Sequence, residues 1–131
     1  MKYLMLIYSN PEPWGHPSYL SIPETLAMDE SEREAMLAAG EAWFDEIRQS
    51  GELVSAEALA APLTARTVRV RDNARLVTDG PYVEAKEQMA GVFVLDCATP
   101  ERAEEIASGV PDARFSAVEL RPIMGSAGQE M

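Results

Sequence analysis

The sequence predicts an α+β domain in which two helices cover one antiparallel sheet. Three observations carry this prediction. Two strand-like runs have apolar residues on both faces, two other segments combine helical periodicity with end signals, and strands and helices follow one another along the chain. With 131 residues the chain is long enough for one domain with a real core, since proteins near this size bury roughly two-thirds of their surface on folding.

The first element is a strand at residues 2–8, KYLMLIY, which is apolar at every position from Tyr3 to Tyr8. Such a run is typical of a strand that is buried on both faces. Residues 9–28 then carry four prolines and one glycine. This composition predicts a long loop or a set of short turns, and long loops in compact domains are often functional.

A long helix is predicted for residues 31–50. Ser31 and Glu34 have the spacing of a capping box, and Gly51 stands where a C-terminal stop is expected. Trp43 and Phe44 are assigned to the core. One helical face carries the apolar stripe Leu37, Gly40, Phe44 and Ile47, which Met36 and Trp43 widen.

A second strand is predicted at residues 52–59, and a hairpin that turns at Asp72-Asn73 is predicted at residues 66–78. Valines alternate with arginines in this hairpin. Because Arg69, Arg71 and Arg75 make it more polar than a core strand, we expect a peripheral excursion from the domain.

The chain ends with a strand, a helix and a strand. Residues 90–96, AGVFVLD, are apolar on both faces, and Thr99-Pro100 supplies an N-cap and a first-turn proline for a helix that ends near Gly109. Residues 113–123 predict the last strand. Residues 1–124 then form one domain, followed by a frayed tail at residues 125–131.

Without the hairpin the order of elements is βαββαβ, the ferredoxin-like arrangement. Two helices cover only one face of such a sheet, whereas the runs at residues 2–8 and 90–96 are apolar on both faces. A second copy of the chain is the simplest cover for the other face, so the sequence predicts a homodimer.

Composition argues against several classes of function. The formal net charge of -11 makes nucleic acid and anionic membrane surfaces poor partners. The single cysteine, Cys97, ends an apolar run and is expected in the core; without an internal disulfide, the chain fits a reducing compartment. The start lacks the pattern of a signal peptide, and no run reaches the ~18 apolar residues of a membrane span. We expect a cytoplasmic protein.

Three stretches resemble a known family. MKYLMLIYSN at the start, TVRVRDNARLVTDGPYVEAKEQMAGVFVLD in the middle and AVELRPIM near the end are similar, in this order, to the YCII-related proteins. Specifically, they resemble the branch named after its DGPF motif, in which Tyr82 here replaces the phenylalanine.

This resemblance implies a ferredoxin-like fold that pairs as a dimeric α/β barrel, with an activity that is largely undefined. Some members of the wider group are credited with a His-Asp pair in which the histidine is on the first long helix. Residues 31–50 contain no histidine, so that pair is not carried over. The resemblance also implies a possible link to an extracytoplasmic-function sigma factor.

The charged segment after the Gly-Pro turn is the first candidate site. Asp79 either closes the turn or joins Glu84, Lys86 and Glu87 at the mouth of a cleft. In the second case Glu84 or Glu87 acts as a base and Lys86 balances the charge. The alternative is a solvated ion pair worth at most ~1 kcal/mol.

The last strand offers a second candidate. Glu119 and Arg121 share the face opposite Val118 and Leu120, so they point away from the helices. They form either an interfacial salt bridge or an anchor for a ligand, in which Arg121 binds an anionic group.

Single residues elsewhere complete the list of candidates. Tyr8 could border the same cleft as Arg121, and His16, the only histidine, could bind a ligand or act as a base. A histidine in a proline-rich loop is more often a surface residue. Trp14, Tyr8 and Tyr19 either floor an aromatic pocket or pack in the core or against a loop.

Three functions stay open: a homodimer that binds a small organic molecule in a cleft, with acid–base chemistry on it as an option; a regulatory protein that acts with a sigma factor; and a structural dimer. The sequence has no C-x-x-C, H-E-x-x-H or glycine-rich nucleotide motif, so we expect neither a metal nor a cofactor.

Overall fold

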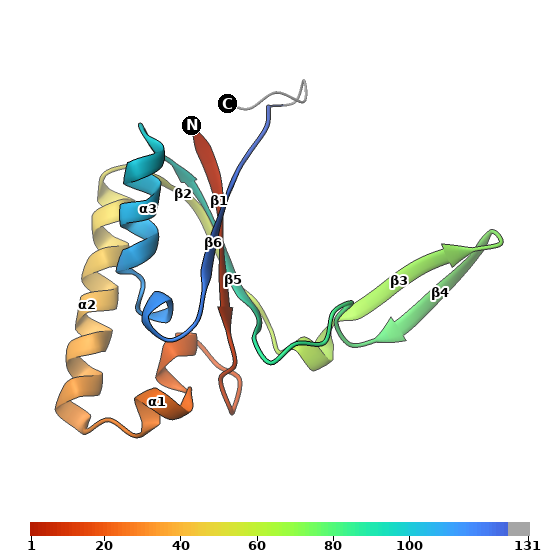
Figure 1. Ribbon diagram of the computed structural model, residues 1–131, viewed down its shortest axis with the longest axis horizontal. Helices are drawn as coiled ribbons and strands as arrows, with labels where there is room; N and C mark the ends of the chain where they lie inside the picture. Colours follow the sequence, from red (N-terminus) through yellow and green to blue (C-terminus); the bar gives the residue numbers. More distant parts are fainter. Residues whose placement is uncertain (126–131) are drawn as a thin grey trace.

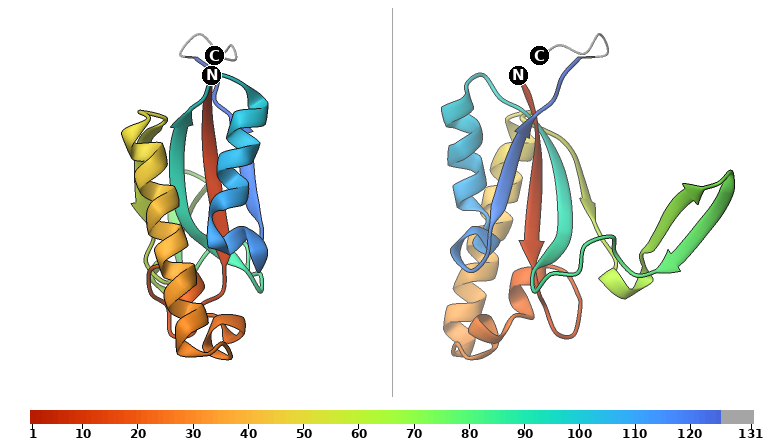
Figure 2. Two further views of the ribbon diagram at one scale, coloured as in Figure 1. Left: turned by 90° about the vertical axis from the view of Figure 1, so that its left-hand side faces the viewer. Right: turned by 45° about the vertical axis from the view of Figure 1, so that its right-hand side comes forward.

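The computed structural model describes residues 1–125, and its centre is a four-stranded antiparallel sheet (Figure 1). The spatial order is β2-β5-β1-β6, formed by β1 (Lys2–Ser9), β2 (Leu53–Ala58), β5 (Gln88–Asp96) and β6 (Val118–Pro122). Helices α2 (Glu30–Gln49) and α3 (Pro100–Gly109) lie side by side on one face of the sheet (Figure 2). With the hairpin set aside, the order is βαββαβ, which confirms the predicted α+β, ferredoxin-like fold.

Short helical turns make most of the remaining connections. The proline-rich segment after β1 contains two of them, Ser18–Leu20 and α1 (Pro23–Leu26), and is therefore a set of short turns, one of its two predicted arrangements. The other two are Pro62–Thr64, before β3, and Pro111–Arg114, before β6. Within residues 1–125 no helix is long and apolar enough to cross a membrane.

Helix α2 begins one residue earlier than predicted, and Asp29 is its N-cap. The Asp29 carboxylate accepts a hydrogen bond from the backbone N–H of Glu32 at 2.8 Å, and the Ser31 hydroxyl donates to the same carboxylate at 2.9 Å. The predicted capping box at Ser31 and Glu34 is therefore wrong, because Ser31 lies inside the first turn. A carboxylate in this place also suits the positive end of the helix dipole.

The last strand is shorter than predicted. Residues 113–117 are not part of it, because Pro111–Arg114 forms a helical turn and β6 starts at Val118. Proline fixes the backbone in the helical range at the first position of this turn. The predicted alternation holds in the strand itself, since Val118 and Leu120 pack against the core under the helices. Of the tail predicted for residues 125–131, all but residue 125 lies outside the described residues.

The main core lies between the sheet and the two helices. Every second residue of β1 from Tyr3 to Ile7 belongs to this core, because the odd-numbered side chains of the strand face the helices. Cys97 is buried there, as the sequence predicts. The buried cluster comprises Tyr3, Met5, Ile7, Ile47, Leu95, Cys97, Ala103, Ile106, Ala107 and Val110.

No helix of residues 1–125 lies over the opposite side of the sheet, and we call this side the helix-free face. Its members stand opposite one another in the strand ladders, where Leu4 pairs with Val94 and Arg121, and Leu6 pairs with Val92 and Glu119. Leu6 is buried and the other apolar members are half-buried by their neighbours alone.

Strands β3 (Arg66–Arg71) and β4 (Ala74–Asp79) form a separate two-stranded sheet, which we call the arm (residues 66–79). Asp72 and Asn73 turn the chain at its tip with φ angles of 52° and 62°. Positive φ at both central residues is the geometry of the tight turns that suit β-hairpins. Figure 1 shows the arm extending away from the sheet and helices.

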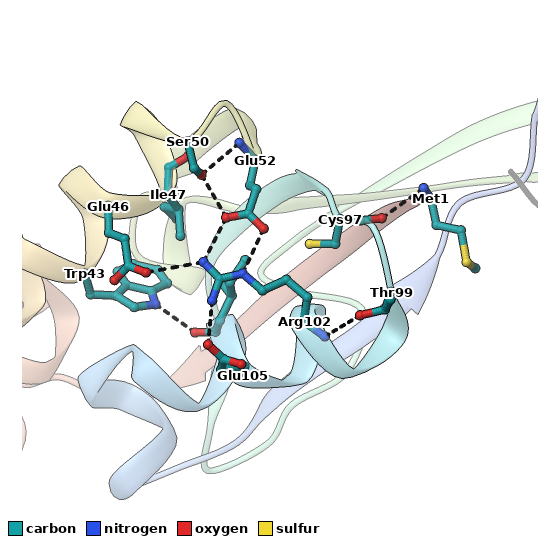
Figure 3. A network of polar contacts seen from close by, with 11 residues as sticks. Met1, Trp43, Glu46, Ile47, Ser50, Glu52, Cys97, Thr99, Arg102 and Glu105 are labelled. Atoms are coloured by element: carbon teal, nitrogen blue, oxygen red, sulfur yellow. Dashed lines mark hydrogen bonds and ion pairs between the residues drawn. The ribbon is translucent and has the colours of Figure 1, made fainter.

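A charged network ties α3 to the connection between α2 and β2 (Figure 3). Arg102 donates to both carboxylate oxygens of Glu52 at 2.8 Å, and it also reaches Glu46 at 3.3 Å and Glu105 at 2.6 Å. The Glu52 side chain is only 18% exposed. The hydrogen bonds from Arg102, with a smaller contribution from Ser50, lower the pKa of Glu52 from 4.5 to about 2.

We expect Glu52→Gln to lower the free energy of unfolding at pH 7 by about 1 to 3 kcal/mol, because a bidentate charged contact is lost. The folded pKa of about 2 lies below the usual 4.5, so Glu52 stabilises the fold above pH 4.5. That contribution disappears as the pH falls through the folded pKa.

Denaturant unfolding at several pH values measures this effect. The gap between wild type and Glu52→Gln should shrink as the pH falls from 4.5 toward 2. Asp45→Asn is the control, since the side chains of its ion pair with Arg48 are 54% and 61% exposed and such pairs contribute less than about 1 kcal/mol. A gap that stays constant across this pH range would contradict the assigned role of Glu52.

Candidate functional site

A cavity of about 660 Å³ lies on the helix side of the sheet, between α2, the proline-rich segment and strands β1, β2 and β5. Its size is that of a site for a small organic molecule. Small residues on the strands leave room beneath the helix, among them Ala56, Ala58 and Gly91. The walls are otherwise formed by Ile7, Leu37, Trp43, Phe44, Phe93 and Val110, and polar groups come from His16, Ser18, Tyr19, Glu41, Glu57 and Asp112.

Three aromatic rings form one wall of this cavity. Trp43 and Phe93 have ring centroids 5.7 Å apart, and Phe44 meets Phe93 edge-on at 6.3 Å. The Trp43 indole N–H donates to the carbonyl of Ile106 on α3 at 2.7 Å, which fixes the ring between the two helices. This arrangement presents apolar ring faces and edges to a bound molecule.

Asp112 is the buried acid at the polar end of the cavity, and its exposed fraction is 4%. Its carboxylate accepts a hydrogen bond from the Ser18 hydroxyl at 2.7 Å. Burial raises the pKa of Asp112, and the Ser18 hydrogen bond and the positive charge of His16 oppose this shift. A carboxyl group held out of water in this way is typical of sites that exchange protons or bind polar ligand groups.

Tyr19 is buried beside Asp112, and its pKa is raised, first by burial and then by the negative charges of Asp112 and Glu41. The phenol is therefore a hydrogen-bond donor at neutral pH. Gly40 of α2 makes room for this ring, because a Cβ atom there would lie 2.4 Å from the Tyr19 hydroxyl oxygen.

His16 lies at the exposed rim of the same cavity. Its Nε2 atom is 2.7 Å from the carbonyl oxygen of Leu59, and the Trp14 indole N–H donates to that oxygen at 2.9 Å. A carbonyl oxygen only accepts hydrogen bonds, so Nε2 carries the hydrogen and Nδ1 of the neutral ring keeps a lone pair. These two contacts also fasten the proline-rich segment to the end of β2.

A smaller cavity of about 240 Å³ lies on the other side of Asp112, which lines both cavities. Lys86, Glu87 and Ser116 belong to its lining, and the Ser116 hydroxyl donates to the Glu87 carboxylate. In residues 1–125 no cluster of three or more His, Cys, Asp or Glu side chains is placed to hold a metal ion.

The predicted charged segment is divided between separate places. Lys86 and Glu87 line the smaller cavity, and Glu84 is exposed and lines neither cavity. Asp79 lies at the base of the arm, where it forms an exposed ion pair with Arg66 at 3.0 Å. The structure therefore does not gather these residues at one cleft mouth, and their catalytic roles remain predictions.

The candidates on the last strand lie on the helix-free face, on the other side of the sheet from the main cavity. Arg121 donates to Glu119 at 2.7 Å, and the Tyr8 hydroxyl donates to Glu119 at 3.5 Å. These three residues come together as predicted, but His16 is separated from them by the sheet. Ligand binding by this group remains a prediction.

Sequence reasoning missed Asp112 and Ser18, which form the buried polar end of the main cavity. Both are short polar residues next to a proline, a pattern typical of surface turns. Their burial comes from the contact of two segments far apart in the chain, which no local pattern records. The sequence does offer Tyr19 as a candidate pocket residue, and Tyr19 lines this cavity.

Asp112→Asn should raise the melting temperature at pH 7 relative to wild type. The folded pKa is raised by burial, so the stabilising contribution is present at low pH and is lost as the pH rises through the folded pKa. The amide keeps the shape and an acceptor for Ser18 without a charge. Its advantage should fade in acid, below the usual Asp pKa of about 4.

Ser18→Ala is the matched variant, because it removes the hydrogen bond to Asp112 and leaves the charge in place. It should lower the melting temperature at pH 7. A melting temperature of Asp112→Asn below that of wild type at pH 7 would show that the carboxylate stabilises the fold and would overturn this reading.

Residues 1–126 match the YCII-related domain. A curated relative, an uncharacterized protein of Rhizobium meliloti (strain 1021), is 32% identical over 77 residues, which are 57% of this chain. The match covers 62% of that relative, less than two thirds of its length.

A solved structure of 5-chloro-2-hydroxyhydroquinone dehydrochlorinase from Burkholderia phenoliruptrix AC1100, in complex with 2,5-dihydroxybenzoquinone, is similar with a TM-score of 0.49 and 10% identity. The superposition covers 99% of this chain and 100% of that chain. Because the domain match spans nearly the whole sequence, this chain belongs to the YCII-related family.

Proposed function

We propose that this protein binds a small organic molecule with an apolar ring in the main cavity, and that it transfers a proton to or from that molecule. One observation carries the proposal: a cavity of about 660 Å³ has an aromatic wall and ends at a buried carboxyl group. Apolar walls with a few converging polar groups are the usual form of a small-molecule site.

The shape of the site indicates how a ligand would lie. Its ring would stack against Trp43, Phe44 and Phe93, which together exclude water. A hydroxyl or carbonyl group would point to the polar end, where it would accept a hydrogen bond from the Tyr19 hydroxyl. The acid Glu41 lines the same cavity, which disfavours anionic ligands.

His16 is the group best suited to accept a proton. Its Nδ1 atom makes no hydrogen bond to any of residues 1–125, while Nε2 is held by Leu59. A proton taken up there would lie near the negative charge of Asp112, whose own pKa responds to the charge of His16. His16 and Asp112 would then act as an acid–base pair within one cavity.

Thermal-shift screening of monocyclic and bicyclic aromatic compounds tests binding. A ligand at 100 times its dissociation constant should stabilise the fold by ~2.7 kcal/mol. Ala56→Phe, which fills the cavity from β2, should abolish the shift, whereas Ala39→Phe on the exposed side of α2 should retain it. If no compound raises the melting temperature of the wild type, or if a compound raises that of Ala56→Phe by the same amount, the cavity is not the site.

The regulatory link to a sigma factor, suggested by the resemblance alone, would then be the alternative.

Proton transfer is tested separately by nuclear magnetic resonance. A bound ligand with an acidic C–H bond should exchange that hydrogen for deuterium faster with the wild-type protein than in buffer. His16→Gln should remove most of this acceleration, because general acid–base groups typically contribute 10²–10⁴-fold, and should leave ligand affinity nearly unchanged. Equal exchange with both proteins would contradict the role of His16.

We also propose that the protein acts as a homodimer whose helix-free faces pack together as a dimeric α/β barrel. The half-buried Leu4, Val92 and Val94 support this proposal, since a face of this kind is normally covered. Light scattering at low micromolar concentration should give twice the chain mass of 14.3 kDa. A folded monomer at that concentration would contradict the dimer.

A further inference from the structure

We infer that the arm is a docking element that grips a second copy of this chain through its valine face. This inference rests on the proposed homodimer and adds a second contact surface to it. Strands β3 and β4 pair from Arg66 and Asp79 at the base to Arg71 and Ala74 near the tip, and they pack mainly on each other.

One face of the arm carries three exposed valines, with Arg75 opposite Val70 at its outer end. Residues opposite each other in an antiparallel ladder point to the same face, so Val68 lies beside Val77, and Val70 follows on that face. The exposed fractions of Val68, Val70 and Val77 are 58%, 61% and 41%. Valines in such positions are typical of strands that pack against another layer.

The opposite face of the arm is already used within the chain. The Arg69 guanidinium lies over the ring of Tyr82 at 5.3 Å, and the Thr67 hydroxyl donates to the carbonyl of Gly80 at 2.9 Å. These contacts hold the base of the arm to the turn that follows it. Leu76 also lies on this face and is 47% exposed, but the valine face carries three of the four exposed large apolar side chains of the arm and is the one assigned to a partner.

The arm also needs support for its own stability. An isolated two-stranded hairpin is marginally stable in water, and both strands of the arm have an unpaired edge. A second layer against the valine face supplies the missing burial. Full burial of an exposed valine contributes about 1.5 to 3 kcal/mol, so covering the three half-exposed valines contributes roughly half of that each before the costs of docking.

Charge favours a second copy as the partner. The arm carries four arginines and two aspartates, a net charge of +2, and the whole chain has a net charge of -11. The rest of the chain therefore carries -13. An arm of the opposite sign is attracted to the acidic body of another copy, and this complementarity promotes encounter in the right orientation.

The direction of the arm agrees with this partner. Figures 1 and 2 show that α2 and α3 lie on one side of the sheet, whereas the arm extends on the other side. A second copy stacked on the helix-free face lies on that same side, next to the arm. Two-fold symmetry then gives each copy one arm to hold and one to receive.

Engineered thiols in the purified full chain test the inference. Val70→Cys and Leu26→Cys place thiols at positions that are 61% and 57% exposed in a single chain, and Leu26 lies on α1, away from the arm. The natural Cys97 is 1% exposed and burial raises its pKa, so it stays silent. The maleimide alkylation rate of each folded variant is divided by the rate of the same variant in denaturant, which removes differences in the intrinsic reactivity of the two thiols.

In the dimer, the thiol at position 70 should react at least ~10-fold more slowly than the thiol at position 26. The two rates should converge when dilution dissociates the dimer. As a second measurement, the double change Val68→Ser and Val77→Ser should raise the dimer Kd at least ~10-fold by sedimentation equilibrium, whereas Leu26→Ser should leave it unchanged.

Equal alkylation rates in a protein that is dimeric by light scattering overturn the docking arm and leave the dimer standing. Protection that does not change with concentration also overturns it, because the arm would then fold onto its own chain. A monomeric wild type overturns the arm together with the dimer. Ligand binding in the cavity is measured separately by the thermal shift, so a failure of that proposal is distinguishable from a failure of the docking arm.

Discussion

The indole of Trp43 is the contact on which the candidate site depends. Its N–H donates to the carbonyl of Ile106, so it ties α2 to α3, and its ring packs on Phe93 of β5. It also fits against Gly109 so closely that a Cβ atom there would lie 2.4 Å from the indole. Helix α2 is thereby held at a fixed place over the sheet. The small residues of β2 and β5 below it leave the space that becomes the cavity.

Helices α2 and α3 cover one face of a sheet that has two faces, and this constraint divides the surfaces of the protein by role. The helix side holds the core, the aromatic wall and the buried Asp112, whose ionised form is costly to keep out of water. A protein that retains such a group gives up stability for it, which is common at functional sites. The helix-free face and the arm carry apolar residues that the rest of residues 1–125 leaves partly exposed, and the proposed dimer rests on these two surfaces.

Periodicity predicted most of the fold, because apolar runs and helical stripes follow local rules. The strand at Tyr3–Tyr8, the stripe of α2 and the turn at Asp72-Asn73 are examples. The start of α2 was misplaced because Asp29 and Ser31 are both good N-caps, and only the backbone geometry selects between them. The extent of β6 was overestimated because a helical turn at Pro111 occupies the residues before it.

The candidate site was harder to predict, because its residues meet only in the folded chain. Glu84, Lys86 and Glu87 form a dense charged motif in the sequence, yet they lie outside the main cavity. Ser18 and Asp112 are separated by 94 residues and form their hydrogen bond out of water. Burial of a carboxyl group is a property of tertiary packing, which spacing along the sequence does not record.

Fluorine resonance of the two tryptophans tests the central claim, that a ligand binds in the cavity beneath α2. A chain labelled with 5-fluorotryptophan should give one signal for Trp14 and one for Trp43, and Trp14→Phe assigns them. A ring-bearing compound that stabilises the protein should shift the Trp43 signal in proportion to its occupancy, because this indole forms the cavity wall. If the compound binds and the Trp43 signal does not move, the ligand lies elsewhere and the account is wrong.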